Sequence, residues 1–151
     1  MIEGVKIREL TRHIDERGYV MEILRADDED FIKFGQVYVS AAFPGIIKAW
    51  HCHTKQVDAF CCIHGNARVG LYDDRENSPT CGEAQGIVIG ELNPAIVQIP
   101  RRVWHGFMAL GGEMAVVLNV PTETYDREDP DELRRDLHDP DIPFEWHVEG
   151  R

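Results

Sequence analysis

The stretch that decides the fold of this 151-residue chain is GIIKAWHCHTKQVD, residues 45–58. Its first half is rich in β-branched and aromatic residues, which favours a strand over residues 46–53. Successive side chains of a strand alternate between its two faces, so His51 and His53 share a face and Cys52 points to the other. A tight turn after His53 then returns the chain, so that Asp58 can face the same point.

Other short runs of the same character recur along the chain and are separated by Gly, Pro, Asn and Asp turn signals. Their even spacing, with little helical periodicity between them, predicts an all-β fold, either an antiparallel sandwich or a barrel. The predicted strands lie at residues 18–24, 36–41, 59–63, 67–72, 95–99 and 114–120.

Two short helices are expected at the periphery, at residues 27–33 and 130–137. The second is indicated by the sequence DPDE at residues 129–132, which places a proline at the first helical position and acids in the first turn. The length of the chain predicts a single domain over residues 1–151.

The distribution of charge restricts the partners. The chain has 16 basic and 27 acidic residues, a formal net charge of −11. Neutralising phosphates requires a basic face, so nucleic acid is not expected as a partner. Residues 42–121 hold seven acids and six bases, whereas residues 122–141 hold nine acids and three bases. The nearly neutral middle of the chain can therefore still bind an anionic ligand.

No apolar run reaches the roughly 20 residues that span a bilayer, and the N-terminal sequence MIEGVKIREL lacks the features of a signal peptide. We therefore expect a cytoplasmic protein without a membrane partner.

A third histidine, His105, ends the segment PRRVWH and is expected on another strand. Three imidazoles and the Asp58 carboxylate converging inside a barrel suit a divalent transition metal such as Zn, Fe, Ni or Mn. This makes His51, His53, Asp58 and His105 candidate metal ligands. The alternative is a polar cavity without a metal, in which Asp58 pairs with one of the histidines.

The spacing resembles the cupin motif G-x5-H-x-H-x4-E-x6-G, followed by P-x-G-x2-H. The chain differs from this motif at Asp58, where glutamate is usual, and at Arg102, where the second motif has glycine. The resemblance implies a cupin-type jelly-roll barrel.

Ordered segments along the whole chain are similar to the dTDP-4-dehydrorhamnose 3,5-epimerase family within that superfamily. The resemblance implies a homodimeric isomerase that acts on nucleotide-linked 4-keto-6-deoxy sugars, and no organic cofactor is expected. The segments are DERGYVME at 15–22, GIIKAWH at 45–51, DRENSPTCG at 74–82, IP and HGF within 99–107, Tyr125, DP at 139–140 and IPFEW at 142–146.

Epimerisation next to a ketone needs a base that removes a proton, a group that stabilises the enolate oxygen, and an acid that protonates the other face. By position, the resemblance makes His51 the base and Tyr125 the acid. The family's lysine, which lies at the enolate oxygen, falls on Asp58. The charge at the electrophilic position is therefore reversed.

The resemblance also implies a set of substrate-binding residues. Arg17 and Glu22 match a segment that reaches the site of the neighbouring subunit. Lys48 stands where an arginine contacts phosphate, and it keeps the charge but loses the bidentate fork. His53 replaces a glutamine, and His105 completes the set.

The charge reversal at Asp58 leaves three hypotheses open. In the first, a metal ion replaces the lysine as Lewis acid in a nucleotide-sugar epimerase; His51 is then a ligand, and Tyr125 or another group is the base. The second is a metal-dependent cupin enzyme of another class, such as an oxygenase. The third is a non-catalytic sugar-binding relative of the epimerases.

Overall fold

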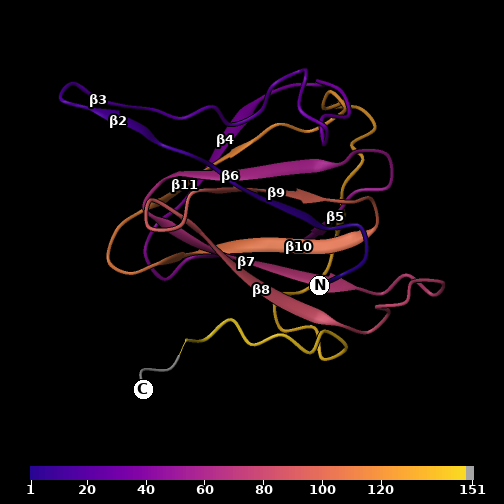
Figure 1. Ribbon diagram of the computed structural model, residues 1–151. Coiled ribbons are helices and arrows are strands. Elements are labelled where there is room, and N and C mark those ends of the chain that lie inside the picture. Colours follow the sequence, from indigo (N-terminus) through magenta and orange to yellow (C-terminus); the bar gives the residue numbers. More distant parts are fainter. Residues whose placement is uncertain (149–151) are drawn as a thin grey trace.

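The computed structural model describes residues 1–148, and its strands form two five-stranded antiparallel sheets and a two-stranded hairpin (Figure 1). The strands are β1 (Lys6–Glu9), β2 (His13–Asp15), β3 (Gly18–Val20), β4 (Tyr38–Ala42), β5 (Ile47–Cys52), β6 (Asp58–His64), β7 (Asn66–Asp73), β8 (Ala84–Gly90), β9 (Ala95–Ile99), β10 (Val103–Leu110), β11 (Ala115–Asn119) and β12 (Leu133–Arg134).

The order of strands in the first sheet is β1-β9-β6-β11-β4, and in the second it is β12-β5-β10-β7-β8. Strands that follow one another in the chain often lie in opposite sheets: β4 and β6 belong to the first, and β5 and β7 to the second. This crossing between two antiparallel sheets is typical of a jelly roll and confirms the predicted fold class.

The apolar core fills the space between the sheets. It includes Phe60 of β6, Val69 of β7 and Phe107 of β10, each at most 3% exposed. A second cluster covers the outer face of β5, β10 and β7, where Trp50 and Trp104 pack with Trp146 of the C-terminal segment. This segment therefore belongs to the packed body of the protein.

The prediction of short helices is wrong, because residues 1–148 contain no helix. Residues 27–33 form turns and irregular chain, and Arg8 of β1 binds Asp28 and Asp30 at 2.9 and 3.2 Å. Residues 130–137 contain β12, which pairs with β5. In the second segment, Asp131, which the sequence suggested for a first helical turn, instead binds residues 54–56.

The predicted strand over residues 18–24 ends at Val20, and strand β8 was not predicted. Glycine lowers strand propensity, and β8 contains Gly86, which lies opposite Gly70 of β7. A Cβ on Gly70 would lie 2.5 Å from the Trp146 ring, so glycine is required there by the covering C-terminal segment.

The loop after β7 is organised around the buried carboxylate of Asp73. This carboxylate accepts hydrogen bonds from the Arg75 guanidinium at 2.7 Å and from the hydroxyls of Ser78 and Thr80 at 2.6 and 2.7 Å. Burial raises the pKa of Asp73, but these hydrogen bonds outweigh burial and hold the pKa well below its usual range.

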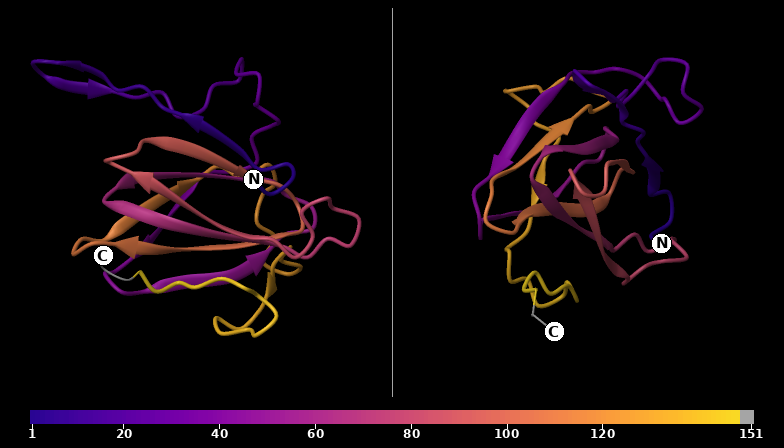
Figure 2. Two further views of the ribbon diagram at one scale, coloured as in Figure 1. Left: turned by 60° about the horizontal axis from the view of Figure 1, so that its bottom comes forward. Right: turned by 60° about the vertical axis from the view of Figure 1, so that its left-hand side comes forward.

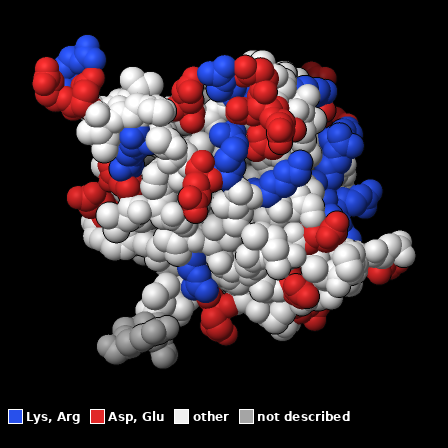
Figure 3. All heavy atoms as spheres, in the orientation of Figure 1, with Lys and Arg blue, Asp and Glu red and all other residues white. Residues whose placement is uncertain are grey.

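The β2–β3 hairpin stands away from the sandwich in Figure 1 and in the left view of Figure 2. On the face shown in Figure 3, acidic and basic side chains are interspersed among uncharged areas. In residues 1–148 we find no helix with the length and apolar character that crossing a bilayer requires.

Candidate active site and metal centre

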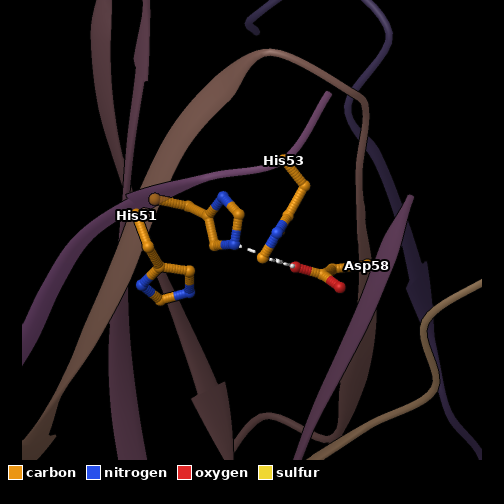
Figure 4. A group of neighbouring side chains, drawn as sticks. His51, His53 and Asp58 are labelled. Atoms are coloured by element: carbon orange, nitrogen blue, oxygen red, sulfur yellow. Dashed lines mark hydrogen bonds and ion pairs between the residues drawn. The ribbon is translucent and has the colours of Figure 1, made fainter. Parts of the chain in front are cut away.

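The predicted histidine and aspartate residues meet between the two sheets. His51 lies on β5 and His105 lies opposite it on β10, while His53 directly follows β5. Asp58 begins β6 in the other sheet and points towards His53 (Figure 4). One potential ligand atom from each of the four residues lies within 4.8 Å of all the others. The segment between His53 and Asp58 therefore returns the chain so that Asp58 faces the same point as His53.

Asp58 is the centre of this cluster, and its side chain is only 1% exposed. Its Oδ2 lies 2.9 Å from His105 Nε2 and 3.2 Å from His53 Nε2. Its Oδ1 accepts hydrogen bonds from the amides of Gln56 and Asn119 at 2.8 and 3.0 Å. One carboxylate oxygen is thus held by two amides, and the other is shared by two imidazoles.

The outer nitrogens of two of these imidazoles are fixed by backbone carbonyls. His105 Nδ1 donates to the Val103 carbonyl at 2.9 Å, and His53 Nδ1 donates to the Asp131 carbonyl. Since a carbonyl only accepts, each Nδ1 carries the hydrogen, and the neutral ring then directs its Nε2 lone pair at Asp58. A lone pair that faces a carboxylate oxygen requires a proton or a cation between them.

Burial lowers the pKa of His51 well below its usual range, and the neighbouring His105 and His53 lower it further. Burial also lowers the pKa of His53, but the hydrogen bond to Asp58 outweighs burial and raises the net value. Burial raises the pKa of Asp58, yet hydrogen bonds from His105 and His53 hold it far below its usual range. The site therefore contains a carboxylate and a neutral His51.

The donor set fits a small divalent cation. Two ligands on an ion with bonds of about 2.0–2.2 Å lie about 3.0–3.5 Å apart, and both Nε2–Oδ2 distances at Asp58 are close to this range. Metal-binding histidines usually donate their second nitrogen to a carbonyl or carboxylate, as His53 and His105 do here. Within residues 1–148, neither ring nitrogen of His51 makes such a hydrogen bond.

The cluster lies at a cavity of about 1110 Å³. Tyr125, the acid by resemblance, and Lys48, the phosphate-binding residue by resemblance, both line this cavity together with His51 and His53. Sites for small molecules usually have about 300–1,000 Å³, so there is room for an extended ligand.

A bulge in β5 places Lys48 at the cavity. His105 pairs with His51, and Phe107 pairs with Lys48. The two positions are three residues apart on β5 but only two residues apart on β10, so β5 contains one extra residue. The extra residue shifts the alternation of faces, and His51 and Lys48 both line the cavity. Close approach at the bulge requires Gly106, because a Cβ there would lie 2.3 Å from the Cβ of Ala49.

The acidic segment 122–141, here called the flap, forms part of the cavity wall. It contributes Asp126, Asp129, Asp131 and other acids. The cations of the wall are Lys48, Lys55, Arg134 and Arg135. Within residues 1–148, Lys48 is the member of that group without an ion pair; its Nζ donates to the Ser40 hydroxyl at 3.1 Å.

Arg17 and Glu22 do not line the cavity of their own chain. Arg17 lies at the tip of the β2–β3 hairpin, where its 85% exposed side chain binds Asp15. Glu22 is exposed and binds Arg25 at 2.8 Å.

Sequence reasoning missed two residues that organise the site. Asn119, on β11, donates to Asp58 and to the Tyr38 hydroxyl. Asp131 accepts four hydrogen bonds from Thr54, Lys55 and Gln56. Burial raises the pKa of Asp131, but these bonds outweigh it and lower the pKa to about 2. The acids at residues 129–132 stand out in the sequence, but the sequence does not show what Asp131 binds, because its partners lie about 75 residues away in the chain.

The chain is similar to known proteins in both sequence and fold. The sequence model of the family described as dTDP-4-dehydrorhamnose 3,5-epimerase matches residues 1–150. A "probable low-salt glycan biosynthesis epimerase" of Haloferax volcanii is 45% identical over 150 residues, which are 98% of this chain and 96% of that protein. A spore coat polysaccharide biosynthesis protein of Bacillus subtilis is 41% identical over 151 residues and covers 100% of both chains. The crystal structure of a dTDP sugar isomerase from Desulfovibrio desulfuricans superposes with a TM-score of 0.90 at 35% identity, covering 96% of this chain and 92% of that one.

Proposed function

Because the chain belongs to the dTDP-4-dehydrorhamnose 3,5-epimerase family and is thus a sugar epimerase acting on a nucleotide sugar, we propose that its substrate is a nucleotide-linked 4-keto-6-deoxy sugar. The observation that carries this proposal is the neutral, partly buried His51 in one cavity with Tyr125 and with Lys48, a cation that forms no ion pair within residues 1–148. These three residues supply a base, an acid and a phosphate contact.

The proposed reaction breaks a C–H bond next to the keto group. His51 takes the proton, and the electron pair of that bond moves to the keto oxygen as an enolate. The electron pair of the enolate then returns to the same carbon, which takes a proton from the Tyr125 hydroxyl on the other face; this forms the new C–H bond and restores the keto group. Proton exchange with solvent returns His51 and Tyr125 to their starting forms.

We further propose that a divalent transition metal ion, of the Zn, Fe, Ni or Mn class, replaces the family's lysine. The geometry favours three ligands: His53, His105 and Asp58. The Nδ1 atom of each histidine is already bound to a backbone carbonyl, and Oδ1 of Asp58 is bound to two side-chain amides, so that Nε2 and Oδ2 remain for the ion. The ion would stabilise negative charge on the keto oxygen as a Lewis acid. His51 lacks such a second partner within residues 1–148, which supports its role as the free base.

Exchange of substrate hydrogen with solvent tests this function. In D2O, the protein should introduce deuterium next to the keto group of a dTDP-linked 4-keto-6-deoxy sugar, as read by NMR. Removal of metal should abolish the exchange, and added Zn²⁺ or Mn²⁺ should restore it. If the protein binds the ion but introduces no deuterium into the sugar, a metal cupin of another class is favoured. If it binds the sugar but neither binds the ion nor introduces deuterium, a non-catalytic relative is favoured.

The His51→Asn variant separates a base from a ligand. It should lose deuterium exchange but keep the thermal stabilisation that the ion gives to the native protein. His64→Asn is the matched control, because His64 is a half-exposed histidine at the end of β6. Loss of ion binding in His51→Asn alone would make His51 a fourth ligand and would contradict its role as the base.

We propose that Arg17 and Glu22 act in the site of a second copy, in a homodimer. The support is that the hairpin stands away from the sandwich (Figure 2), and that the Arg17 side chain is 85% exposed and does not line its own cavity. Mixing inactive Arg17→Ala and inactive His51→Asn subunits should restore activity, since a mixed dimer contains one complete site. No recovery in a demonstrated mixed dimer would contradict the proposal.

A further inference from the structure

Asp131 links the flap to the cluster at Asp58. Its Oδ1 accepts from the Thr54 amide at 2.9 Å and from the Thr54 hydroxyl at 2.6 Å. Its Oδ2 accepts from the amides of Lys55 at 2.7 Å and Gln56 at 3.2 Å. One carboxylate therefore holds residues 54–56 of the turn that separates His53 from Asp58.

Two connections run from Asp131 into the cluster. The Asp131 carbonyl receives the hydrogen of His53 Nδ1, which leaves Nε2 facing Asp58. The backbone of Gln56 is bound to the Asp131 carboxylate, and the Gln56 side chain donates to Asp58 Oδ1 at 2.8 Å. Asp131 thus contacts His53 directly and Asp58 through Gln56.

The flap is attached to β5 at the same place. Leu133 pairs with Cys52 and Arg134 with His51, and the Arg135 amide donates to the Trp50 carbonyl at 3.1 Å. An ordered flap is therefore a condition for the Asp131 carbonyl to stand at His53.

We propose that Asp131 is a positioning residue that fixes His53 and Asp58 for cation binding through the turn at residues 54–56. This inference rests on the proposed metal site. It also makes the flap part of that site: releasing the flap frees the His53 ring and loosens the Gln56 contact to Asp58. Groups that orient metal ligands typically change metal affinity by about 10- to 100-fold when they are removed.

Asp131→Ala should remove protection from hydrogen exchange at the amides of residues 54–56. The ¹⁵N resonances of the His53 ring should show that its proton is no longer held on Nδ1. The affinity for Zn²⁺ should fall by about 10- to 100-fold. Asp131→Asn keeps one acceptor oxygen and should give an intermediate effect. Asp129→Ala is the control, because the Asp129 side chain is 84% exposed and contacts Lys55 only at 3.6 Å.

Unchanged His53 resonances, or unchanged Zn²⁺ affinity in a folded Asp131→Ala protein with exposed amides at 54–56, would overturn the inference. If Asp131→Ala does not fold, Asp131→Asn and Thr54→Val provide the same readouts. A native protein that binds no Zn²⁺ would refute the proposed metal centre. The amide and His53 readouts on the metal-free protein would still decide whether Asp131 positions His53.

Discussion

Replacing Asp58 by asparagine or by alanine separates its structural role from its role as a metal ligand. In the native protein, Oδ1 accepts from Gln56 and Asn119, and Oδ2 faces His53 and His105. Asparagine keeps an oxygen for the two amides. Its NH2 group can donate to both imidazoles in their neutral forms. Alanine leaves the two amides without an acceptor.

The expected magnitudes follow from these contacts. Each buried unsatisfied donor costs about 1–3 kcal/mol, so Asp58→Ala should lose about 2–6 kcal/mol through Gln56 and Asn119. For a chain of this size that loss corresponds to a fall in Tm of roughly 5–20 °C. Asp58→Asn should lose less stability than Asp58→Ala when no metal is present, because the amides of Gln56 and Asn119 keep an acceptor.

Thermal unfolding of metal-free protein, with and without added Zn²⁺, measures both effects. At a free ion concentration about 100 times Kd, the native protein should gain about 2.7 kcal/mol, or about 5–10 °C in Tm. Both Asp58 variants should lose this gain, because neither has the carboxylate. Retention of the full gain by Asp58→Asn would refute Asp58 as a ligand. Equal stability of the two metal-free variants would refute the hydrogen-bond reasoning.

Three further predictions address substrate binding, acid stability and packing. Lys48→Ala should raise the KM for the nucleotide sugar at least about tenfold, whereas Lys55→Ala should have a small effect; similar changes in both would argue against a phosphate contact at Lys48. The lowered pKa of Asp73 stabilises the fold above the unfolded-state pKa of about 3.9, and this stabilisation is lost as the pH falls below it. Between pH 4 and about pH 2.5, Tm should therefore fall more steeply for the native protein than for Asp73→Asn, and parallel slopes would contradict this. Gly106→Ala should cost about 1–3 kcal/mol in chemical unfolding, because its Cβ meets β5, while Gly112→Ala, with open space around it, should cost little; equal effects would disprove the close approach.

Much of the site could be predicted from the sequence because its spacing is local. The alternation of a strand places His51 and His53 on one face, and the short turn to Asp58 limits where that carboxylate can lie. Their meeting with His105 is confirmed by the distances at Asp58. The resemblance added Tyr125 to this list, and the structure places it in the same cavity.

The acidic segment shows where local reasoning fails. A proline followed by acids favours the start of a helix, because carboxylates bind the free amides of a first turn. Asp131 does bind free amides, but they belong to residues 54–56. A carboxylate binds amides equally well near or far along the chain, so the sequence of the segment alone does not choose between the two.

The sequence by itself determined the all-β fold class and three imidazoles with one carboxylate on converging strands, because strand period and turn length are properties of neighbouring residues. The tertiary structure alone decided that Asn119 and Asp131 hold this set, and that a bulge opposite Gly106 turns Lys48 into the cavity. The physical reason is that these contacts join segments about 60–80 residues apart, and their register depends on how the two sheets pack against each other.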